Sequence, residues 1–286
     1  MSHNFPIDAV RAQFPVLNRE VHGKPLAYFD SAASAHKPLA VIEAQAKYLA
    51  ERHSNIHRGV HALAQEATEA YEASRETVRA HLNAASTKEV LFVAGTTDGI
   101  NLVAQTWGRA NLDQGDCILL TRMEHHSNIV PWQMLAQERG VEVLVVELNE
   151  DGTLDGEMFE AHLGREPKLV AFTHVSNALG TVNDVKHWTQ RAHEVGATVL
   201  VDGAQAVPHL AVDVRDLDVD FYTFSGHKTY GPTGIGILYG KEALLDAMPP
   251  WRGGGEMIDT VSFCLLYTSD AADEGLGVDL GGRRII

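Results

Sequence analysis

The chain has 286 residues, of which 45% are hydrophobic, and its 38 acidic against 23 basic side chains give a formal net charge of -15. This length and composition suffice to bury the core of an enzyme, whereas the negative charge repels polyanions, so no nucleic-acid partner is expected. Only two cysteines are present, and the N-terminus offers neither a signal peptide nor a membrane-spanning block. We therefore expect a cytoplasmic protein with no disulfide framework and no membrane contact.

Short apolar runs alternate with longer amphipathic ones from Glu89 onward, which is typical of a mostly parallel sheet covered by helices on both faces. We predict an α/β fold whose seven strands lie near Val90, Ile118, Val143, Val170, Leu200, Tyr222 and Ile237. Helices are predicted after His126 and after Asn183, each closing on a glycine that suits a C-cap. In such folds ligands bind beyond the carboxyl ends of the strands, so the residues that follow each strand are the candidates for function.

The first candidates follow the strand near Val90. Gly95, Thr96 and Thr97 open a helix there, and its free backbone N–H groups and hydroxyls form an anion site that suits a phosphate. An ordinary helix start explains these residues equally well. The chain contains neither G-x-G-x-x-G nor G-x-x-x-x-G-K-[ST], so the usual loops for dinucleotide and nucleotide phosphates are missing.

Two further polar segments, 124–128 and 174–180, follow apolar runs and place His125 and Asn177 at the same edge of the sheet. An imidazole can stack on a flat heteroaromatic ring, and an amide can bind a phenolic oxygen or a carboxylate. A lone histidine more commonly satisfies only local backbone groups, and this alternative stays open for His125.

Asp202 follows a run of branched apolar residues, and Gln205 lies three positions later. From this segment alone, an aspartate that caps the next helix is the favoured interpretation. The functional alternative is a carboxylate that keeps a pyridine nitrogen protonated, which makes the ring an electron sink for a substrate carbanion.

The segment FSGHKTYGPTGIG, residues 224–236, is the most informative one. Most lysines are solvated surface charges, but Lys228 comes at the end of a strand and before a glycine-rich loop. Ser225 and His227 can donate hydrogen bonds to a phosphate, and a buried lysine has a lowered pKa that suits imine formation with an aldehyde. Because Asp202 and Lys228 belong to adjacent strand units, we expect both to face one ligand.

In this order the motifs resemble the fold-type I pyridoxal 5'-phosphate (PLP) enzymes of the class V aminotransferase superfamily, and within it the SUF-type (group II) cysteine desulfurases. The resemblance runs from about Val10 to Phe263. It includes FDSAAS at Phe29, NIHRGVH at Asn55, AGTTDGINLVA at Ala94, MEHHSNIVPWQ at Met123, THVSNALGT at Thr173, VDGAQAVPH at Val201 and DFYTFSGHKTYGPTGIGILYG at Asp220. It implies that residues 1–34 belong to the small-domain side and residues 35–263 to the PLP-binding large domain.

The resemblance also assigns residues to the site. It implies that Lys228 binds the aldehyde of PLP covalently, that Asp202 pairs with the pyridinium nitrogen and that His125 stacks on the ring. His57 and Arg58 match a loop at the interface of a homodimer, where two subunits complete each other's pockets. The other implied contacts, to the phenolic oxygen or substrate and to the phosphate, are those of Asn177, Gln205, Thr96, Thr97, Ser225 and His227.

The implied reaction is that of a sulfurtransferase, which converts L-cysteine to L-alanine and accepts L-selenocysteine as a secondary substrate. In this mechanism Lys228 exchanges its imine with the substrate amine and then moves protons, while a cysteine thiolate attacks the substrate's sulfur. The sulfur is held as an enzyme persulfide for iron-sulfur cluster assembly. Kinship suggests a SufE-like carrier as its acceptor.

The chain departs from the family pattern in two places. Ala94 stands where the family usually has arginine, and Asp98 replaces the usual glutamate. Residues 264–286, CLLYTSDAADEGLGVDLGGRRII, resemble no part of the family. We expect this tail to be artefactual and the C-terminal small domain, which supplies the nucleophilic cysteine, to be absent. The chain is then expected to bind PLP but to turn over little cysteine, since neither Cys117 nor Cys264 suits the nucleophile's role.

Three other functions remain open. A different PLP enzyme of the superfamily, such as an aminotransferase, a kynureninase-like enzyme or an epimerase, shares the cofactor pocket, and a non-catalytic PLP-binding fragment is the second alternative. The third, a metal-dependent hydrolase, is the weakest, because Gly59 and Asn55 disfavour one helix through its histidines and no carboxylate accompanies them. Those histidines are His53, His57, His61, His125 and His126. We therefore expect no metal site.

Overall fold

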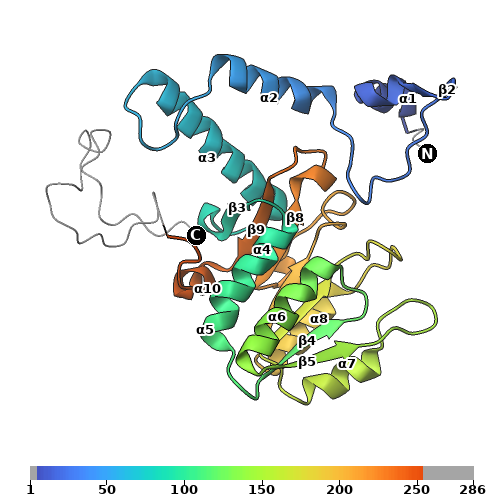
Figure 1. The fold of residues 1–286 in the computed structure, drawn as a ribbon, viewed down its shortest axis with the longest axis vertical. Helices are drawn as coiled ribbons and strands as arrows, with labels where there is room; N and C mark the ends of the chain where they lie inside the picture. The colour runs from blue at the N-terminus through green and yellow to red at the C-terminus, as the bar shows by residue number, and fades with distance from the viewer. Residues whose placement is uncertain (1–4, 254–286) are drawn as a thin grey trace, which may run out of the picture.

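A computed structural model describes residues 5–253. Its centre is a seven-stranded sheet of order β3-β9-β8-β7-β6-β4-β5 (Figure 1). In chain order the strands are Val90–Val93 (β3), Cys117–Thr121 (β4), Glu142–Val146 (β5), Leu169–Thr173 (β6), Thr198–Asp202 (β7), Phe221–Ser225 (β8) and Gly236–Gly240 (β9). The seven predicted strands and the α/β fold are confirmed.

Strand pairing explains why polar residues gather at one edge of the sheet. The strands β5, β4, β6, β7 and β8 pair in parallel, whereas β9 runs antiparallel between β8 and β3. Thr173 of β6 is in register with Asp202 of β7, which is in turn in register with Thr223 of β8. The carboxyl ends of these three strands are therefore level, so the residues that follow them meet at one edge.

Helices cover both faces of the sheet because successive side chains of each strand point to opposite faces. One core contains Ile100 and Trp132, from the helices Thr96–Val103 (α4) and Val130–Arg139 (α6), together with Ile118 of β4. The other contains Phe159 and Ala192, from the helices Gly156–Leu163 (α7) and Val185–Glu194 (α8). The shorter segments around these cores are the π-helix Ala104–Gly108, the 3-10 helix Thr87–Glu89 and the helices Arg109–Asn111 (α5), Val214–Leu217 (α9) and Glu242–Ala247 (α10).

The two helices predicted from their closing glycines are α6 and α8. Gly140 caps α6 in the left-handed conformation, with φ 69°, and its N–H donates to the Ala136 carbonyl. The cap of α8 is Val195, and the predicted glycine follows it as Gly196 with φ 78°. In both places glycine supplies the positive φ that reverses the chain after a helix.

The N-terminal segment extends away from the sheet (Figure 1). It consists of Ile7–Ala12 (α1), the 3-10 helix Pro15–Asn18, the antiparallel pair Glu20–Val21 (β1) and Lys24–Pro25 (β2), Leu39–Glu51 (α2) and Ala62–Leu82 (α3). Neither α1 nor α2 buries a residue, whereas α3 buries Leu82 in the sheet's core. No helix within residues 5–253 is long and apolar enough to cross a membrane. The tail at 264–286, with Cys264, lies outside the described residues.

Candidate active site

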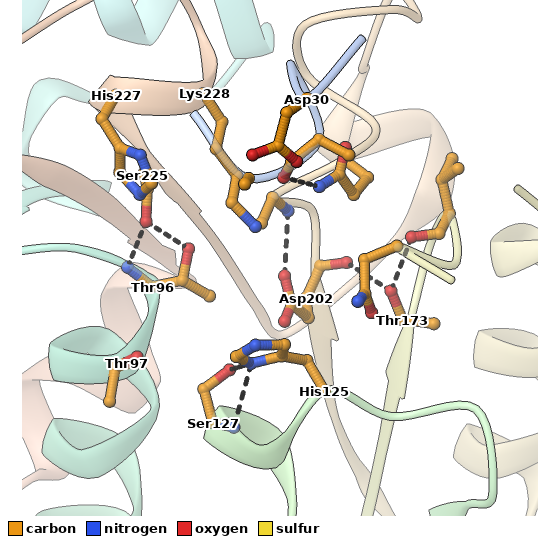
Figure 2. Close-up of a pocket in the computed structure, with 16 residues that line it drawn as sticks. Asp30, Thr96, Thr97, His125, Ser127, Thr173, Asp202, Ser225, His227 and Lys228 are labelled. Carbon is orange, nitrogen blue, oxygen red and sulfur yellow. Dashed lines mark hydrogen bonds between the residues drawn. The ribbon is translucent and has the colours of Figure 1, made fainter. Parts of the chain in front are cut away.

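A cavity of about 490 Å³ lies at the carboxyl edge of the sheet (Figure 2). Every residue that the sequence predicted to contact PLP lines it: Thr96, Thr97, His125, Asn177, Asp202, Gln205, Ser225, His227 and Lys228. The structure adds lining residues that the sequence analysis did not single out, namely Asp30, Ala32, Ala33, Ser127, Thr173, Val175 and Ala204. His57 and Arg58 are not among the lining residues.

Asp202 ends β7 and is only 4% exposed. Its Oδ1 accepts a hydrogen bond of 2.9 Å from the Ala204 N–H, and no group among residues 5–253 donates to its Oδ2. Burial raises the pKa of Asp202, while the Ala204 hydrogen bond and the charge of Lys228 oppose the rise. A buried carboxylate with one free oxygen at a cavity suits a cationic N–H donor.

Lys228 ends the 3-10 turn Gly226–Lys228, which directly follows β8. Burial lowers the pKa of Lys228, and the charge of Asp202 works against that decrease. Within the described part of the chain the amine has no hydrogen-bond or ion-pair partner, and Figure 2 shows it in the same cavity as Asp202. An amine with a lowered pKa is more often in the neutral, nucleophilic form.

The loop after Lys228 folds back onto Gly226. The Gly231 N–H donates to the Gly226 carbonyl at 2.8 Å, and the Gly226 N–H donates to the Ile235 carbonyl at 2.9 Å. A Cβ on Gly226 would lie 3.0 Å from the Ile235 carbonyl oxygen, and one on Gly231 would lie 3.0 Å from that of Gly226. The glycines thus allow the close backbone approach that fixes the turn of Lys228.

A second group of donors lies where α4 begins. Ser225 Oγ accepts from the Thr96 N–H at 2.9 Å and pairs with Thr96 Oγ1 at 2.8 Å, which joins the end of β8 to the start of α4. A Cβ on Gly236 would lie 2.5 Å from the Gly95 Cα, so glycine is needed for β9 to pass this close. The N–H groups of the first helical turn and these hydroxyls face the cavity, and their binding of a phosphate stays a prediction.

His125 lies at the cavity in the turn between β4 and α6. Its Nδ1 accepts from the Ser127 N–H at 3.2 Å and pairs with Ser127 Oγ at 2.8 Å. Burial and the charge of Lys228 lower the pKa of His125, so the neutral ring is favoured at physiological pH. His125 thus bonds to local backbone, as the alternative interpretation of the sequence has it, and also lies at the cavity.

Residues 30–33, between β2 and α2, form one wall of the cavity, and long-range hydrogen bonds of residues 32–37 hold this wall there. Gln205 Nε2 donates to the Ala32 carbonyl at 2.6 Å, so this amide is engaged with the wall. The His227 carbonyl accepts from the Ala35 N–H at 3.0 Å and from Lys37 Nζ at 2.9 Å. The FDSAAS motif contains this wall, but it led to no prediction about the site, because nothing in it indicates which strand it contacts.

The histidines of the hydrolase alternative lie in two places, His53, His57 and His61 between α2 and α3, and His125 and His126 after β4. His57 follows α2 with φ 63°, and its Nε2 is 3.3 Å from Glu72 Oε1, whereas His61 is the N-cap of α3. Among residues 5–253, no group of three or more His, Cys, Asp and Glu side chains has the arrangement of a metal site. The assignment of His57 and Arg58 to a dimer interface stays a prediction.

Comparison with known proteins places the chain in a family. Residues 27–275 match the model of the class V aminotransferases, so the match extends beyond Phe263, where the motif resemblance ends. A curated cysteine desulfurase of Enterobacter sp. (strain 638) is 57% identical over 259 residues, which cover 91% of this chain and 64% of the relative. The chain therefore spans about 64% of the length of these curated relatives.

Solved structures show the same similarity to cysteine desulfurases. The cysteine desulfurase CsdA from Escherichia coli is 43% identical with a TM-score of 0.80, over 91% of this chain and 64% of that one. SspA, solved in complex with cysteine, is 28% identical with a TM-score of 0.73, over 80% of this chain and 65% of that one. The α/β fold, the polar cavity at the carboxyl ends of its strands and the family match together show that the chain belongs to the class V aminotransferase family.

Proposed function

We propose that this protein is a PLP-dependent cysteine desulfurase, which converts L-cysteine to L-alanine and passes the sulfur on. The observation that carries the proposal is one cavity with a half-buried lysine amine, a buried carboxylate with a free oxygen, and the donor groups of a helix start. The 57% identity to a curated cysteine desulfurase supports the substrate class. The binding of cysteine by the similar protein SspA agrees with it.

The residues present fit PLP. Lys228 would bind its aldehyde, the free Oδ2 of Asp202 would accept from the pyridinium N–H, and His125 would stack on the ring. Ser225, Thr96, Thr97 and His227 would hold the phosphate. When bound, PLP supplies an electron sink for negative charge at the substrate's α-carbon.

The protein's own groups then have distinct tasks. The Lys228 amine, whose pKa is lowered by burial, takes up and returns a proton at the substrate's α-carbon. Asp202 keeps a negative charge at the inner side of the cavity, and the neutral ring of His125 is available to hold a proton near the substrate. The three groups come from the ends of three different strands, so the sheet itself fixes their relative positions.

Sulfur transfer requires a thiol, and Cys117 does not suit this role. It begins β4, at the opposite end of that strand from the cavity, and its Sγ donates to the Arg165 carbonyl at 3.5 Å. Burial raises the pKa of its thiol, which disfavours the reactive thiolate. We propose that the sulfur leaves on another thiol, toward a SufE-like acceptor for iron-sulfur cluster assembly in the cytoplasm, and that the enzyme works as a homodimer and also accepts L-selenocysteine.

Cofactor binding tests the proposal directly. Purified full-length protein mixed with PLP should develop a visible absorbance band, and borohydride should then fix the cofactor on the peptide that contains Lys228, as seen by mass spectrometry. The Lys228→Ala variant is the control and should show neither signal. A folded protein without the band would defeat the proposal.

Turnover of cysteine is a separate measurement. Alanine and sulfide release with a reductant present should be small, because Cys117 is unsuited to accept the sulfur. Measurable turnover would show that Cys264, the second cysteine of the chain, performs that step. Amino-group transfer to an added keto acid would instead favour an aminotransferase of the same family.

A further inference from the structure

A buried carboxyl group lies next to the cavity and has no task in the proposed chemistry. Glu124 directly precedes His125 and is 8% exposed. Its Oε1 accepts from Thr121 Oγ1 at 2.5 Å and from the Thr173 N–H at 3.0 Å, and its Oε2 accepts from Asn128 Nδ2 at 2.7 Å. Burying a carboxyl group is costly unless donors surround it, so this set of bonds is a built arrangement.

The first two bonds join neighbouring strands where their own pairing has ended. The register between β4 and β6 runs only through Ile118↔Leu169 and Leu119↔Val170. Thr121 and Thr173 are the last residues of these strands, and the Glu124 carboxyl connects them beyond the ladder. Glu124 thus sets the separation of the two strand ends, one of which places Thr173 in the cavity wall.

The third bond continues into helix α6. Asn128 Oδ1 accepts from Trp132 Nε1 at 2.9 Å, and both side chains are completely buried. Between Glu124 and Asn128 the chain forms the turn that presents His125 and Ser127 to the cavity (Figure 2). The turn is therefore attached at one end to the sheet, through Glu124, and at the other to the helix, through Trp132.

We propose that Glu124 is a positioning residue for the cofactor site: its carboxyl group holds the turn of His125 and the end of β6 at the spacing that a bound PLP ring requires. This inference rests on the proposed PLP function. A residue needed only for folding would affect stability alone. A positioning residue also affects how the folded protein binds and orients the ring.

The Glu124→Gln variant tests this with almost no change in shape. Its amide oxygen keeps the bonds from Thr121 and Thr173, but its N–H₂ group faces the donor Nδ2 of Asn128. If the Asn128 amide rotates to offer its oxygen instead, Trp132 loses its acceptor. Relative to the ionised carboxyl group one buried hydrogen bond is lost either way, so above pH 8, where Glu124 is charged, PLP affinity should fall about tenfold, and the visible circular dichroism of bound PLP should decrease.

The double variant Glu124→Gln with Asn128→Asp provides the rescue. The new carboxylate at position 128 accepts from both the new amide and Trp132, so the buried bonds are complete again. We expect it to regain most of the PLP affinity and of the circular dichroism signal. Glu138→Gln, an exposed change on α6 next to Arg109, is the matched control and should leave both signals as in the wild type.

Four results bear on the outcome. The inference is overturned if folded Glu124→Gln binds PLP with wild-type affinity and circular dichroism, or if the double variant regains thermal stability without regaining the PLP signal. Should both variants fail to fold, Thr121→Val, which keeps the side-chain shape but removes the donor to Glu124 and the acceptor of the Met123 N–H, should weaken PLP binding about threefold, and unchanged binding would overturn it. A wild-type protein that does not bind PLP refutes the proposed function instead.

Discussion

Two buried acidic side chains at the carboxyl edge of the sheet differ in their hydrogen-bond partners. Asp202 leaves one oxygen free at the cavity, whereas both oxygens of Glu124 are occupied by protein donors. Burial raises the pKa of both, and for Glu124 it reaches about 8 despite the bonds from Thr121, Asn128 and Thr173, with the charge of Asp202 adding to the increase. The two acids therefore interact, and the ionisation of Glu124 costs stability in the folded protein.

The pH dependence of stability follows from this shift. The pKa of Glu124 is higher in the folded state than the ordinary 4.5, so its contribution is fully present below about pH 4.5 and is lost as the pH rises to about 8. Urea unfolding over this range should show that the unfolding free energy of the wild type decreases, relative to that of Glu124→Gln, as the pH rises. A difference that stays constant with pH would show that Glu124 titrates normally.

Gly203, which follows Asp202, has no space for a side chain, because the Tyr222 ring lies beside it. A Cβ there would lie 2.0 Å from Cε1 of Tyr222, a fully buried residue whose hydroxyl is 2.9 Å from His174 Nδ1. Gly203→Ala should therefore destabilise the protein by about 1–3 kcal/mol and weaken PLP binding through Asp202. In Gly156→Ala the new Cβ would meet only Trp188 at 3.6 Å, and thermal unfolding of the two variants should differ accordingly.

At the scale of the elements, the sequence predicted what depends on local pattern. Strands that are covered on both faces are apolar runs in the sequence, so all seven were predicted. The polar residues that follow these strands were predicted as site residues, and they line the inner side of the cavity. The antiparallel direction of β9 was not predictable, because an apolar run does not indicate which way a strand runs. Asp30 and the wall around it were missed because only long-range bonds, such as that from Gln205 to Ala32, bring that segment to the sheet. Glu124 was passed over because a buried acid has no distinctive sequence pattern.

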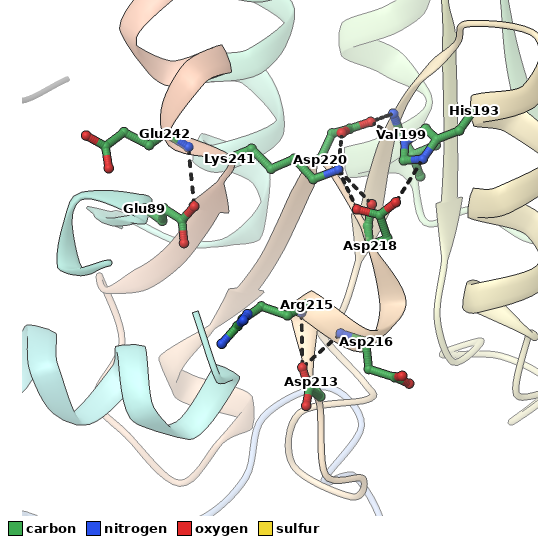
Figure 3. Close-up of polar contacts among 10 residues, drawn as sticks. All are labelled: Glu89, His193, Val199, Asp213, Arg215, Asp216, Asp218, Asp220, Lys241 and Glu242. Carbon is green, nitrogen blue, oxygen red and sulfur yellow. Dashed lines mark hydrogen bonds and ion pairs between the residues drawn. The ribbon is translucent and has the colours of Figure 1, made fainter. Parts of the chain in front are cut away.

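A polar cluster around Asp220, the residue before β8, links α8, β7 and Lys241, the residue after β9 (Figure 3). Asp220 Oδ2 pairs with His193 Nε2 at 2.8 Å and accepts from the Val199 N–H at 2.7 Å, while Lys241 Nζ lies 2.9 Å from Oδ1. The hydrogen bond to Asp220 raises the pKa of His193. These contacts connect the ends of three elements with one carboxylate.

The His193→Gln variant should reveal this cluster in a pH titration. Because the pKa of His193 is raised in the folded state, its stabilising contribution is fully present below about pH 6.5 and is lost as the pH rises through the folded value. The wild type should therefore exceed the variant in unfolding free energy most clearly in mild acid. Equal pH profiles for the two proteins would contradict the role of the cluster.

At the scale of the whole molecule, the N-terminal segment and the sheet differ in burial. Helix α2 buries no side chain, and its apolar residues Leu39, Ile42 and Leu49 are exposed by 44%, 44% and 68%. Helices of soluble proteins usually bury such a face against another surface. The proposed homodimer offers that surface.

Hydrogen exchange at several protein concentrations tests this. Amides of β6 and β7 should be protected at every concentration, because these central strands are buried on both faces. Amides of α2 should exchange quickly in dilute protein and more slowly as the concentration rises and the proposed dimer forms. Protection of α2 that does not depend on concentration would contradict this.

The position of β9 affects the order in which the chain acquires its structure during synthesis. The first strand of the sheet, β3, pairs with the last, β9, through registers such as Val90↔Tyr239. On the ribosome, β3 must therefore wait with its apolar side chains unpaired until almost the whole α/β unit has emerged, while the parallel strands can already associate. Contacts this distant in sequence slow folding and prolong exposure to aggregation, so nascent chains of this protein should depend on chaperones until β9 arrives.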